Sequence, residues 1–248
     1  MTDLLLVVDF DGTVYRGDAA ARGYARRVAA ALRPAEAERY LDAVERYAAL
    51  GVAAAAAPGT DTVDAAALRD CVDLWDAAAR LSRRYGIGAE VLGPAFAETR
   101  GAMLDPSCEL EVVTELMDTL AAVRGAARVV LATNSPRLGL EPLLARLGVA
   151  GAFDEVVSGA DKPAGLRRLL RRELGADLAA RPWRAFSLGD HYPNEIAPAV
   201  EIGAAAGYID RFGRADGPAT ASAPVVEELL PAIHAWIADP QAAAVRVR

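Results

Sequence analysis

The chain has 248 residues, of which 53% are hydrophobic and 25% charged, with a formal net charge of −7 at pH 7. This composition is typical of a globular protein, and its acidic balance argues against nucleic-acid and anionic-membrane partners, which attract basic surfaces. We find no signal peptide, no apolar run that could span a bilayer and no CxxC pairing of Cys71 and Cys108, and therefore expect a cytoplasmic protein.

The first element is an uninterrupted apolar run, Leu4–Val8, which predicts a strand buried on both faces in the middle of a parallel sheet. Asp9 and Asp11 follow it, and side chains two positions apart on an extended chain point to the same side. Gly12 permits a sharp turn that brings backbone N–H groups towards the two carboxylates. Ligands of open α/β sheets bind at the carboxyl ends of the strands, so this stretch is a candidate active site.

Two neighbouring carboxylates repel each other unless a cation or strong hydrogen bonds offset their charge. A hard divalent cation with oxygen ligands, Mg²⁺ above all, is the simplest solution. One carboxylate would still be available as a nucleophile or as an acid/base. The alternative is a turn with two solvated aspartates, because Asp-x-Asp-Gly is short enough to occur by chance.

Residues 17–104 show helical periodicity and no strand signal, with Gly and Pro at several helix ends. The expected helices are Ala19–Leu32, Ala35–Leu50, a long helix from Asp61 or Asp64 to about Gly86, and Ala89–Met103; residues 53–60 read as a loop.

Strands and helices alternate after residue 105. The expected strands are Arg128–Ala132, Phe153–Val157, Arg184–Leu188 and Ala204–Ile209, and the expected helices are Glu109–Val123, Leu138–Leu147, Pro163–Leu174, Asn194–Ile202 and Val225–Ile237. With the first strand, this order predicts an α/β fold with a doubly wound parallel sheet. Residues 1–16 and 105–248 would form the core, and residues 17–104 an all-helical inserted domain.

Rare residue types mark further positions. Only one of the 27 basic residues is a lysine, Lys162, and the only asparagines are Asn134 and Asn194. In a chain so biased towards Ala and Arg, we expect such residues to remain where a substitute fails, since Arg and Lys are not interchangeable in a tight site. Lys162 also begins a predicted helix, where a cation is electrostatically unfavourable, so a plain surface role fits it poorly.

The loops after successive strands carry these residues in the order Asp9/Asp11, Thr133, Lys162 and Asp190/Glu195. Together the stretches DFDGT, LATNS, DKP and GDHYPNE resemble the four motifs of the haloacid dehalogenase-like (HAD) superfamily. The helical insert resembles the cap that this family carries between its first and second motifs. His191 stands where the family usually has Ser or Thr, and Glu195 where it usually has Asp.

The resemblance implies a role for each position. Asp9 would be the nucleophile that forms an aspartyl phosphate, and Asp11 the acid/base. Thr133 and the N–H of Asn134 would bind phosphoryl oxygens with Lys162. Asp9, the main-chain carbonyl of Asp11 and Asp190 would hold Mg²⁺, and Glu195 would be a further metal ligand through water or would orient Asn194 instead.

The resemblance thus implies a Mg²⁺-dependent phosphatase for a small phosphorylated metabolite, with a cap that closes to exclude water. Asp11 favours phosphatases and phosphomutases, because dehalogenases of the family lack an acid at that place. A phosphomutase and a catalytically silent binding or regulatory protein of the same fold stay open as alternatives. We expect a monomer or homodimer.

Overall fold

A computed structural model describes residues 3–244 of the chain. These residues form two compact units: one comprises the chain up to Arg16 and from Glu111 onward, and the other is Gly17–Leu110.

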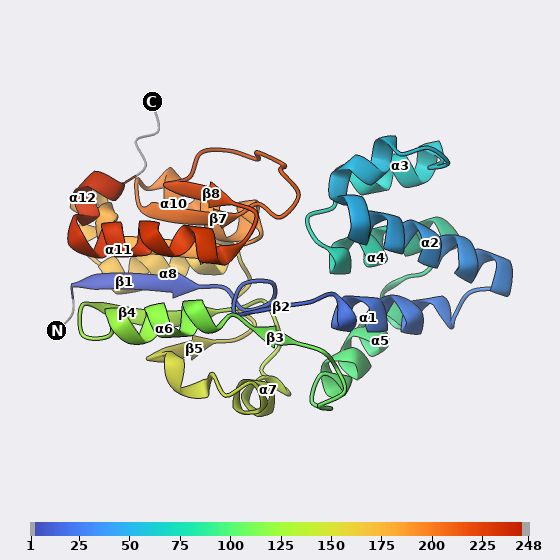
Figure 1. Ribbon diagram of the computed structural model, residues 1–248, viewed down its shortest axis with the longest axis horizontal. Coiled ribbons are helices and arrows are strands. Elements are labelled where there is room, and N and C mark those ends of the chain that lie inside the picture. Colours follow the sequence, from blue (N-terminus) through green and yellow to red (C-terminus); the bar gives the residue numbers. More distant parts are fainter. Residues whose placement is uncertain (1–2, 245–248) are drawn as a thin grey trace. The chain divides into compact units, whose positions relative to one another are not determined.

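The first unit is built on a six-stranded sheet with the order β5-β4-β1-β6-β7-β8, in which all neighbouring strands are parallel (Figure 1). The strands are β1 (Leu4–Val8), β4 (Ala127–Ala132), β5 (Glu155–Val157), β6 (Ala185–Gly189), β7 (Ala205–Ile209) and β8 (Ala221–Ala223). The predicted α/β class with a parallel sheet is confirmed. The strand order reverses direction about β1, which lies between β4 and β6, so the end of β1 is the switch point where such sheets bind ligands.

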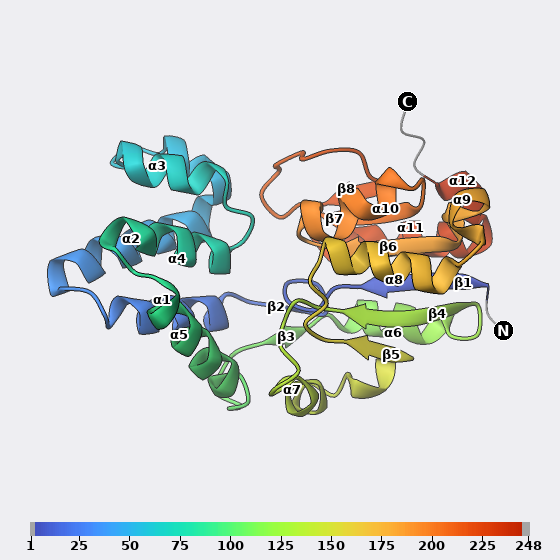
Figure 2. The ribbon, with the colours of Figure 1, turned by 180° about the vertical axis from the view of Figure 1, so that it is seen from behind.

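Apolar residues on both faces of the sheet explain the position of β1. Leu5 and Val7 belong to a buried cluster with α8 (Ala164–Leu174) and α10 (Ala197–Glu201) on one face. On the other face lie α6 (Thr114–Val123) and α11 (Leu230–Ala238), and Trp236 of α11 packs on Phe186 with ring centroids 5.5 Å apart (Figures 1 and 2). Burying one Leu or Val side chain contributes about 1.5–3 kcal/mol, so the central strand is firmly anchored.

The remaining helices of this unit are α7 (Leu140–Arg146), α9 (Asp177–Ala180) and α12 (Pro240–Ala243). A single π-turn, Tyr192–Ile196, precedes α10, and a 3-10 turn, Val226–Leu229, precedes α11. The predictions of continuous helices over Asn194–Ile202 and Val225–Ile237 were therefore wrong in detail. The short helix α12 begins after Asp239, whose side chain accepts a hydrogen bond from the N–H of Ala242.

A two-stranded antiparallel ribbon connects this unit to the rest of the chain. It consists of β2 (Tyr15–Arg16) and β3 (Glu111–Val112), with Tyr15 paired to Val112. The chain leaves the unit directly after β2 and returns directly before β3. The sequence did not predict this ribbon, and the prediction of a helix from Glu109 was wrong, since α6 begins only at Thr114.

The second unit is helical. Its helices are α1 (Ala19–Ala29), α2 (Pro34–Leu50), α3 (Thr62–Arg69), α4 (Leu74–Ser82) and α5 (Ala89–Ala102). Trp75 packs against Tyr24 and Phe96, with ring centroids 5.4 and 5.5 Å apart, in an aromatic cluster between helices of this unit. The segment expected to be a loop contains a 3-10 turn at Gly51–Ala56.

The long helix predicted between Asp61 and Gly86 is two helices. The Asp61 side chain caps α3 by accepting from the N–H groups of Val63 and Asp64. A second cap then starts α4, because Asp73 accepts from the N–H of Asp76 at 2.6 Å. A side-chain acceptor at the start of a helix satisfies an otherwise unpaired backbone donor, so Asp73 favours a new helix over continuation of the old one.

Within the part of the chain that the structure describes, no helix is both long and apolar enough to cross a membrane.

Candidate active site

The two aspartates after β1 lie at the carboxyl end of the sheet. The N–H of Asp9 donates to the carbonyl of Leu188 at 2.9 Å, which extends the pairing of β1 with β6 by one residue. Gly12 has φ +86°, a conformation that residues with a Cβ rarely adopt. A Cβ at Gly12 would lie 2.2 Å from Asp190 Oδ2, so the Asp190 carboxylate packs directly on the loop that carries Asp9 and Asp11.

Lys162 lies between two carboxylates. Its Nζ is 2.5 Å from Asp9 Oδ1 and 2.7 Å from Glu195 Oε1. The other oxygen of Glu195 accepts from the N–H of His191 at 2.7 Å. Asp9, Lys162 and Glu195 are all buried, although the segments that carry them are far apart in sequence. The lysine that composition singled out is therefore a buried, paired cation.

The electrostatics of this triad follow from its burial. Burial raises the pKa of Asp9 and, against the opposing effect of Lys162, raises the pKa of Glu195 to about 8. Burial also lowers the pKa of Lys162, but the two carboxylates beside it outweigh this effect and hold that pKa above its ordinary value. Two carboxylates share one ammonium group, so the triad favours a further proton or cation nearby.

Asn134 fixes the backbone of Lys162. Its Oδ1 accepts from the N–H of Lys162 at 2.7 Å, and its Nδ2 donates to the Lys162 carbonyl at 3.3 Å. Two of the rarest residues in the chain therefore contact each other. An aspartate at position 134 could accept but not donate, so only an amide of this length supplies both bonds.

Thr133 directly follows β4 and is almost completely buried. Its Oγ1 accepts from the N–H of Ser135 at 3.0 Å, and its own hydroxyl hydrogen can be donated to a ligand oxygen. The loop that holds it is joined to the loop before α8, because the N–H of Ala160 donates to the Thr133 carbonyl at 2.9 Å.

The Asp11 carboxyl accepts hydrogen bonds from two hydroxyl groups. Tyr15 Oη donates to its Oδ1 at 2.5 Å and Ser135 Oγ donates to its Oδ2 at 2.6 Å. Neither Tyr15 nor Ser135 was predicted from the sequence as a site residue. Ser135 lies inside the LATNS motif and could have been considered, whereas no pattern in the sequence marks Tyr15.

The structure brings several of the predicted site residues together. Asp9 and Lys162 are in contact, Asn134 binds the Lys162 backbone, and Asp190 packs on the loop of Asp9 and Asp11. Glu195, expected as a metal ligand, instead places one oxygen on Lys162 and the other on the His191 N–H. Its metal role stays a prediction, and its contacts favour a role in holding Lys162.

The described residues contain no cluster of three or more His, Cys, Asp and Glu side chains arranged to hold a metal ion. The predicted ligand set is of another kind, with the carboxylates of Asp9 and Asp190 and one main-chain carbonyl, that of Asp11. All are oxygen donors, which Mg²⁺ prefers. The small residue at Gly12 leaves the space that the Asp190 carboxylate occupies, so the residues present are compatible with such a cation.

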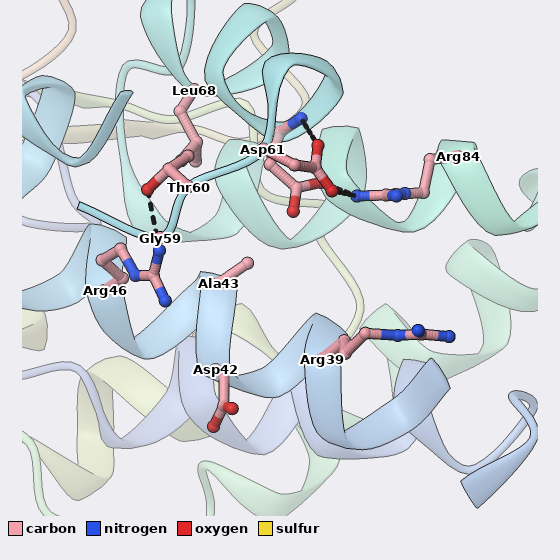
Figure 3. A pocket seen from close by; sticks show the side chains of 10 residues that line it. Arg39, Asp42, Ala43, Arg46, Gly59, Thr60, Asp61, Leu68 and Arg84 are labelled. Atoms are coloured by element: carbon pink, nitrogen blue, oxygen red, sulfur yellow. Dashed lines mark hydrogen bonds and ion pairs between the residues drawn. The ribbon is translucent and has the colours of Figure 1, made fainter. Parts of the chain in front are cut away.

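The helical unit has a pocket of its own, of about 130 Å³. Figure 3 shows Arg84 directed at Asp61, and Arg46 bonded to the neighbouring Thr60. Its lining mixes both signs of charge and contains none of the predicted catalytic residues: Arg39, Asp42, Ala43, Arg46, Gly59, Thr60, Asp61, Asp64, Leu68 and Arg84.

Comparison with solved structures finds the same fold in proteins of differing activity. YfnB of Bacillus subtilis, described as a HAD-hydrolase bound to magnesium, is 14% identical with a TM-score of 0.57, and the match covers 92% of this chain and 97% of that one. A HAD phosphatase of Thermococcus onnurineus is 19% identical with a TM-score of 0.52, over 94% and 98% of the two chains. A 2-haloacid dehalogenase of Pseudomonas syringae is 18% identical with a TM-score of 0.50, over 95% and 100%.

No curated protein matches the sequence. The model of the haloacid dehalogenase-like hydrolase family matches residues 4–179, which is most of the chain and includes β1 and the segments that carry Thr133 and Lys162. With the parallel sheet and the loops at its carboxyl edge, this match identifies the chain as a member of the haloacid dehalogenase-like hydrolases.

Proposed function

We propose that the protein is a Mg²⁺-dependent phosphatase that hydrolyses a small phosphate monoester through an aspartyl phosphate on Asp9. The observation that carries the proposal is the buried contact of Asp9 with Lys162, at 2.5 Å, at the carboxyl end of β1. A carboxylate nucleophile must approach a phosphoryl group that is itself negative. A buried ammonium group beside both would reduce that repulsion.

The first half of the reaction transfers the phosphoryl group to Asp9. An oxygen of Asp9 attacks phosphorus, the bond from phosphorus to the ester oxygen breaks, and Asp11 gives its proton to the departing alkoxide. The Thr133 hydroxyl and the Asn134 N–H would bind the phosphoryl oxygens. Bound Mg²⁺, held by Asp9, the Asp11 carbonyl and Asp190, would supply charge neutralisation for the phosphoryl group.

The second half releases phosphate. Asp11, now ionised, takes a proton from a water molecule, whose oxygen attacks the phosphorus of the aspartyl phosphate. The bond between phosphorus and the Asp9 oxygen breaks, so that Asp9 is regenerated and inorganic phosphate leaves. One carboxyl group thus serves both as acid and as base, which returns the enzyme to its starting protonation state.

The residue at position 11 supports a phosphatase over a dehalogenase. An acid stands there, which the dehalogenases of the family lack, and its carboxyl is held by two hydroxyl groups. Solved structures with this fold include a phosphatase, a hydrolase bound to magnesium and a 2-haloacid dehalogenase, so the fold is compatible with either reaction. Three further statements stay predictions: that the helical unit closes as a cap, that the substrate is a small metabolite, and that the protein is a monomer or homodimer.

A substrate panel tests the proposal. Purified protein with Mg²⁺ should release phosphate from p-nitrophenyl phosphate and from at least one phosphorylated metabolite, and chelation of the metal should abolish the release. Asp9→Asn should be inactive, while Asp118→Asn, which alters an exposed aspartate of the same unit, should retain full activity.

Absence of turnover across the panel, or equal turnover by Asp9→Asn and the wild type, would refute the proposal. Halide release from 2-haloacids would indicate a dehalogenase. A requirement for a bisphosphate activator without net phosphate release would indicate a phosphomutase.

A further inference from the structure

The Asp11 carboxyl is held by donors from two different elements. Tyr15 Oη, from β2, donates to Oδ1 at 2.5 Å, and Ser135 Oγ, from the loop after β4, donates to Oδ2 at 2.6 Å. Each oxygen of the carboxyl therefore has its own hydroxyl donor. We call Tyr15 and Ser135 the hydroxyl clamp.

Both members of the clamp are fixed by their surroundings. Tyr15 is 3% exposed, its ring packs edge-on against Phe10 with centroids 5.2 Å apart, and its backbone pairs with Val112. Ser135 is 6% exposed, its N–H donates to Thr133 Oγ1, and its carbonyl accepts from the N–H of Gly159 at 2.8 Å. These contacts fix the Tyr15 ring and the backbone of Ser135.

An aspartate side chain on its own would sample several staggered rotamers. A group that must give a proton to one oxygen atom and later take one from water needs a fixed distance and plane in both steps. We propose that Tyr15 and Ser135 are positioning residues that hold Asp11 at the reacting atoms, an inference that rests on the phosphatase function proposed above.

The chemistry of hydroxyl groups suits both protonation states of Asp11. When the carboxyl is ionised, both hydroxyls donate to it, as in this structure. When it is protonated, one oxygen still accepts from a hydroxyl while the other carries the proton that goes to the leaving oxygen. A serine hydroxyl can donate or accept, so the clamp adapts to the change without a change of residue.

This role has a signature that general loss of structure lacks. The proton from Asp11 matters most when the departing oxygen is basic. Phenyl phosphate and p-nitrophenyl phosphate have nearly the same shape, but phenolate is a much more basic leaving group than p-nitrophenolate. The parameter kcat/KM reports the steps up to the first irreversible one, here the transfer of the phosphoryl group to Asp9, so it isolates the step in which Asp11 acts as an acid.

The experiment compares kcat/KM for the two esters in wild type, Tyr15→Phe and Ser135→Ala. Tyr15→Phe keeps the buried ring and removes only the hydroxyl. Tyr208→Phe is the matched control, because Tyr208 is 2% exposed and donates to another carboxylate, Asp216, at 2.6 Å. Crystal structures of wild type and Tyr15→Phe record the rotamer of Asp11.

General acid catalysis contributes about 10²- to 10⁴-fold, so we expect Tyr15→Phe to lose about tenfold more kcat/KM on phenyl phosphate than on p-nitrophenyl phosphate. Ser135→Ala should show the same preference, and Tyr208→Phe none. The Asp11 side chain should be displaced in the Tyr15→Phe crystal.

If the wild type is active, equal losses of kcat/KM on both esters in Tyr15→Phe, or no loss on either ester, would overturn the clamp. A wild type inactive on both esters and across the substrate panel would refute the phosphatase instead. In that case an unchanged Asp11 rotamer in Tyr15→Phe would overturn the clamp as well, and a displaced side chain would support it.

Discussion

The variant Gly12→Ala tests whether the position of the Asp190 carboxylate matters for metal binding, once the effect of backbone strain at Gly12 is accounted for. Gly12 has φ +86°, and a Cβ there would lie 2.2 Å from Asp190 Oδ2 and 2.9 Å from its Cγ. The left-handed conformation costs a residue with a Cβ about 1–2 kcal/mol. The clash adds little to this cost, because a short, half-buried side chain can rotate away, but rotation would remove the Asp190 carboxylate from the predicted metal site.

Gly125 provides the matched control. It has φ +91°, lies in the same unit, and a Cβ added there would meet no atom within 4 Å. Gly125→Ala should therefore carry the same backbone strain without displacing any group. At about 2–4 °C per kcal/mol for a protein of this size, both variants should melt a few degrees below wild type.

Activity should distinguish the two variants. Gly125→Ala should keep wild-type kcat/KM. Gly12→Ala should need at least about tenfold more Mg²⁺ for half-maximal activity, as expected when a metal-site group is disturbed. The assay is phosphate release during Mg²⁺ titration, alongside thermal unfolding followed by circular dichroism. If the two variants match in Mg²⁺ requirement, Asp190 does not serve the metal site.

Three further predictions concern single contacts. Lys162→Arg should lower kcat/KM about a hundredfold or more, because a guanidinium does not fit the buried space between Asp9 and Glu195; activity near wild type in a steady-state assay would show that any cation suffices. Asn134→Ala removes two hydrogen bonds to the Lys162 backbone, so it should reduce the free energy of unfolding by about 1–2 kcal/mol and also lower kcat. Denaturant unfolding and steady-state kinetics measure these two quantities, and an unchanged free energy of unfolding together with an unchanged kcat would contradict the prediction. Asp73→Ala removes the cap of α4 and should cost about 1 kcal/mol in thermal unfolding, and an unaltered melting temperature would show that α4 does not depend on this cap.

The sequence predicted five of the six sheet strands. Four of them, β1, β4, β6 and β7, are mostly buried runs of five or six residues, whereas β5 is shorter and partly exposed. The sixth, Ala221–Ala223, has only three small residues and no apolar run, so it gave no signal. The ribbon of β2 and β3 was missed for a similar reason, since two residues per strand are too few to show a period. Asp73 was read as part of one long helix because a single capping residue breaks the pattern only slightly.

The sequence predicted that the candidate site lies at the carboxyl edge of the sheet and which residues reach it. Residues that follow parallel strands meet at one edge, which brings Asp9, Lys162 and Asp190 together without knowledge of the packing. The contacts of particular atoms were not predictable. Asn134 binds the Lys162 backbone and Tyr15 binds Asp11 through geometry that only the folded chain creates. The same applies to Glu195, whose contact with Lys162 no pattern in the sequence indicated.

The central claim is that Asp9 accepts the phosphoryl group, and trapping the covalent intermediate tests it most directly. Wild-type protein mixed with a substrate and Mg²⁺, quenched in acid within one turnover and digested, should yield a phosphorylated peptide that contains Asp9, detected by mass spectrometry. Asp9→Asn should yield none. Rapid phosphate release with no modified Asp9 peptide at any quench time, or undiminished release by Asp9→Asn, would contradict the account.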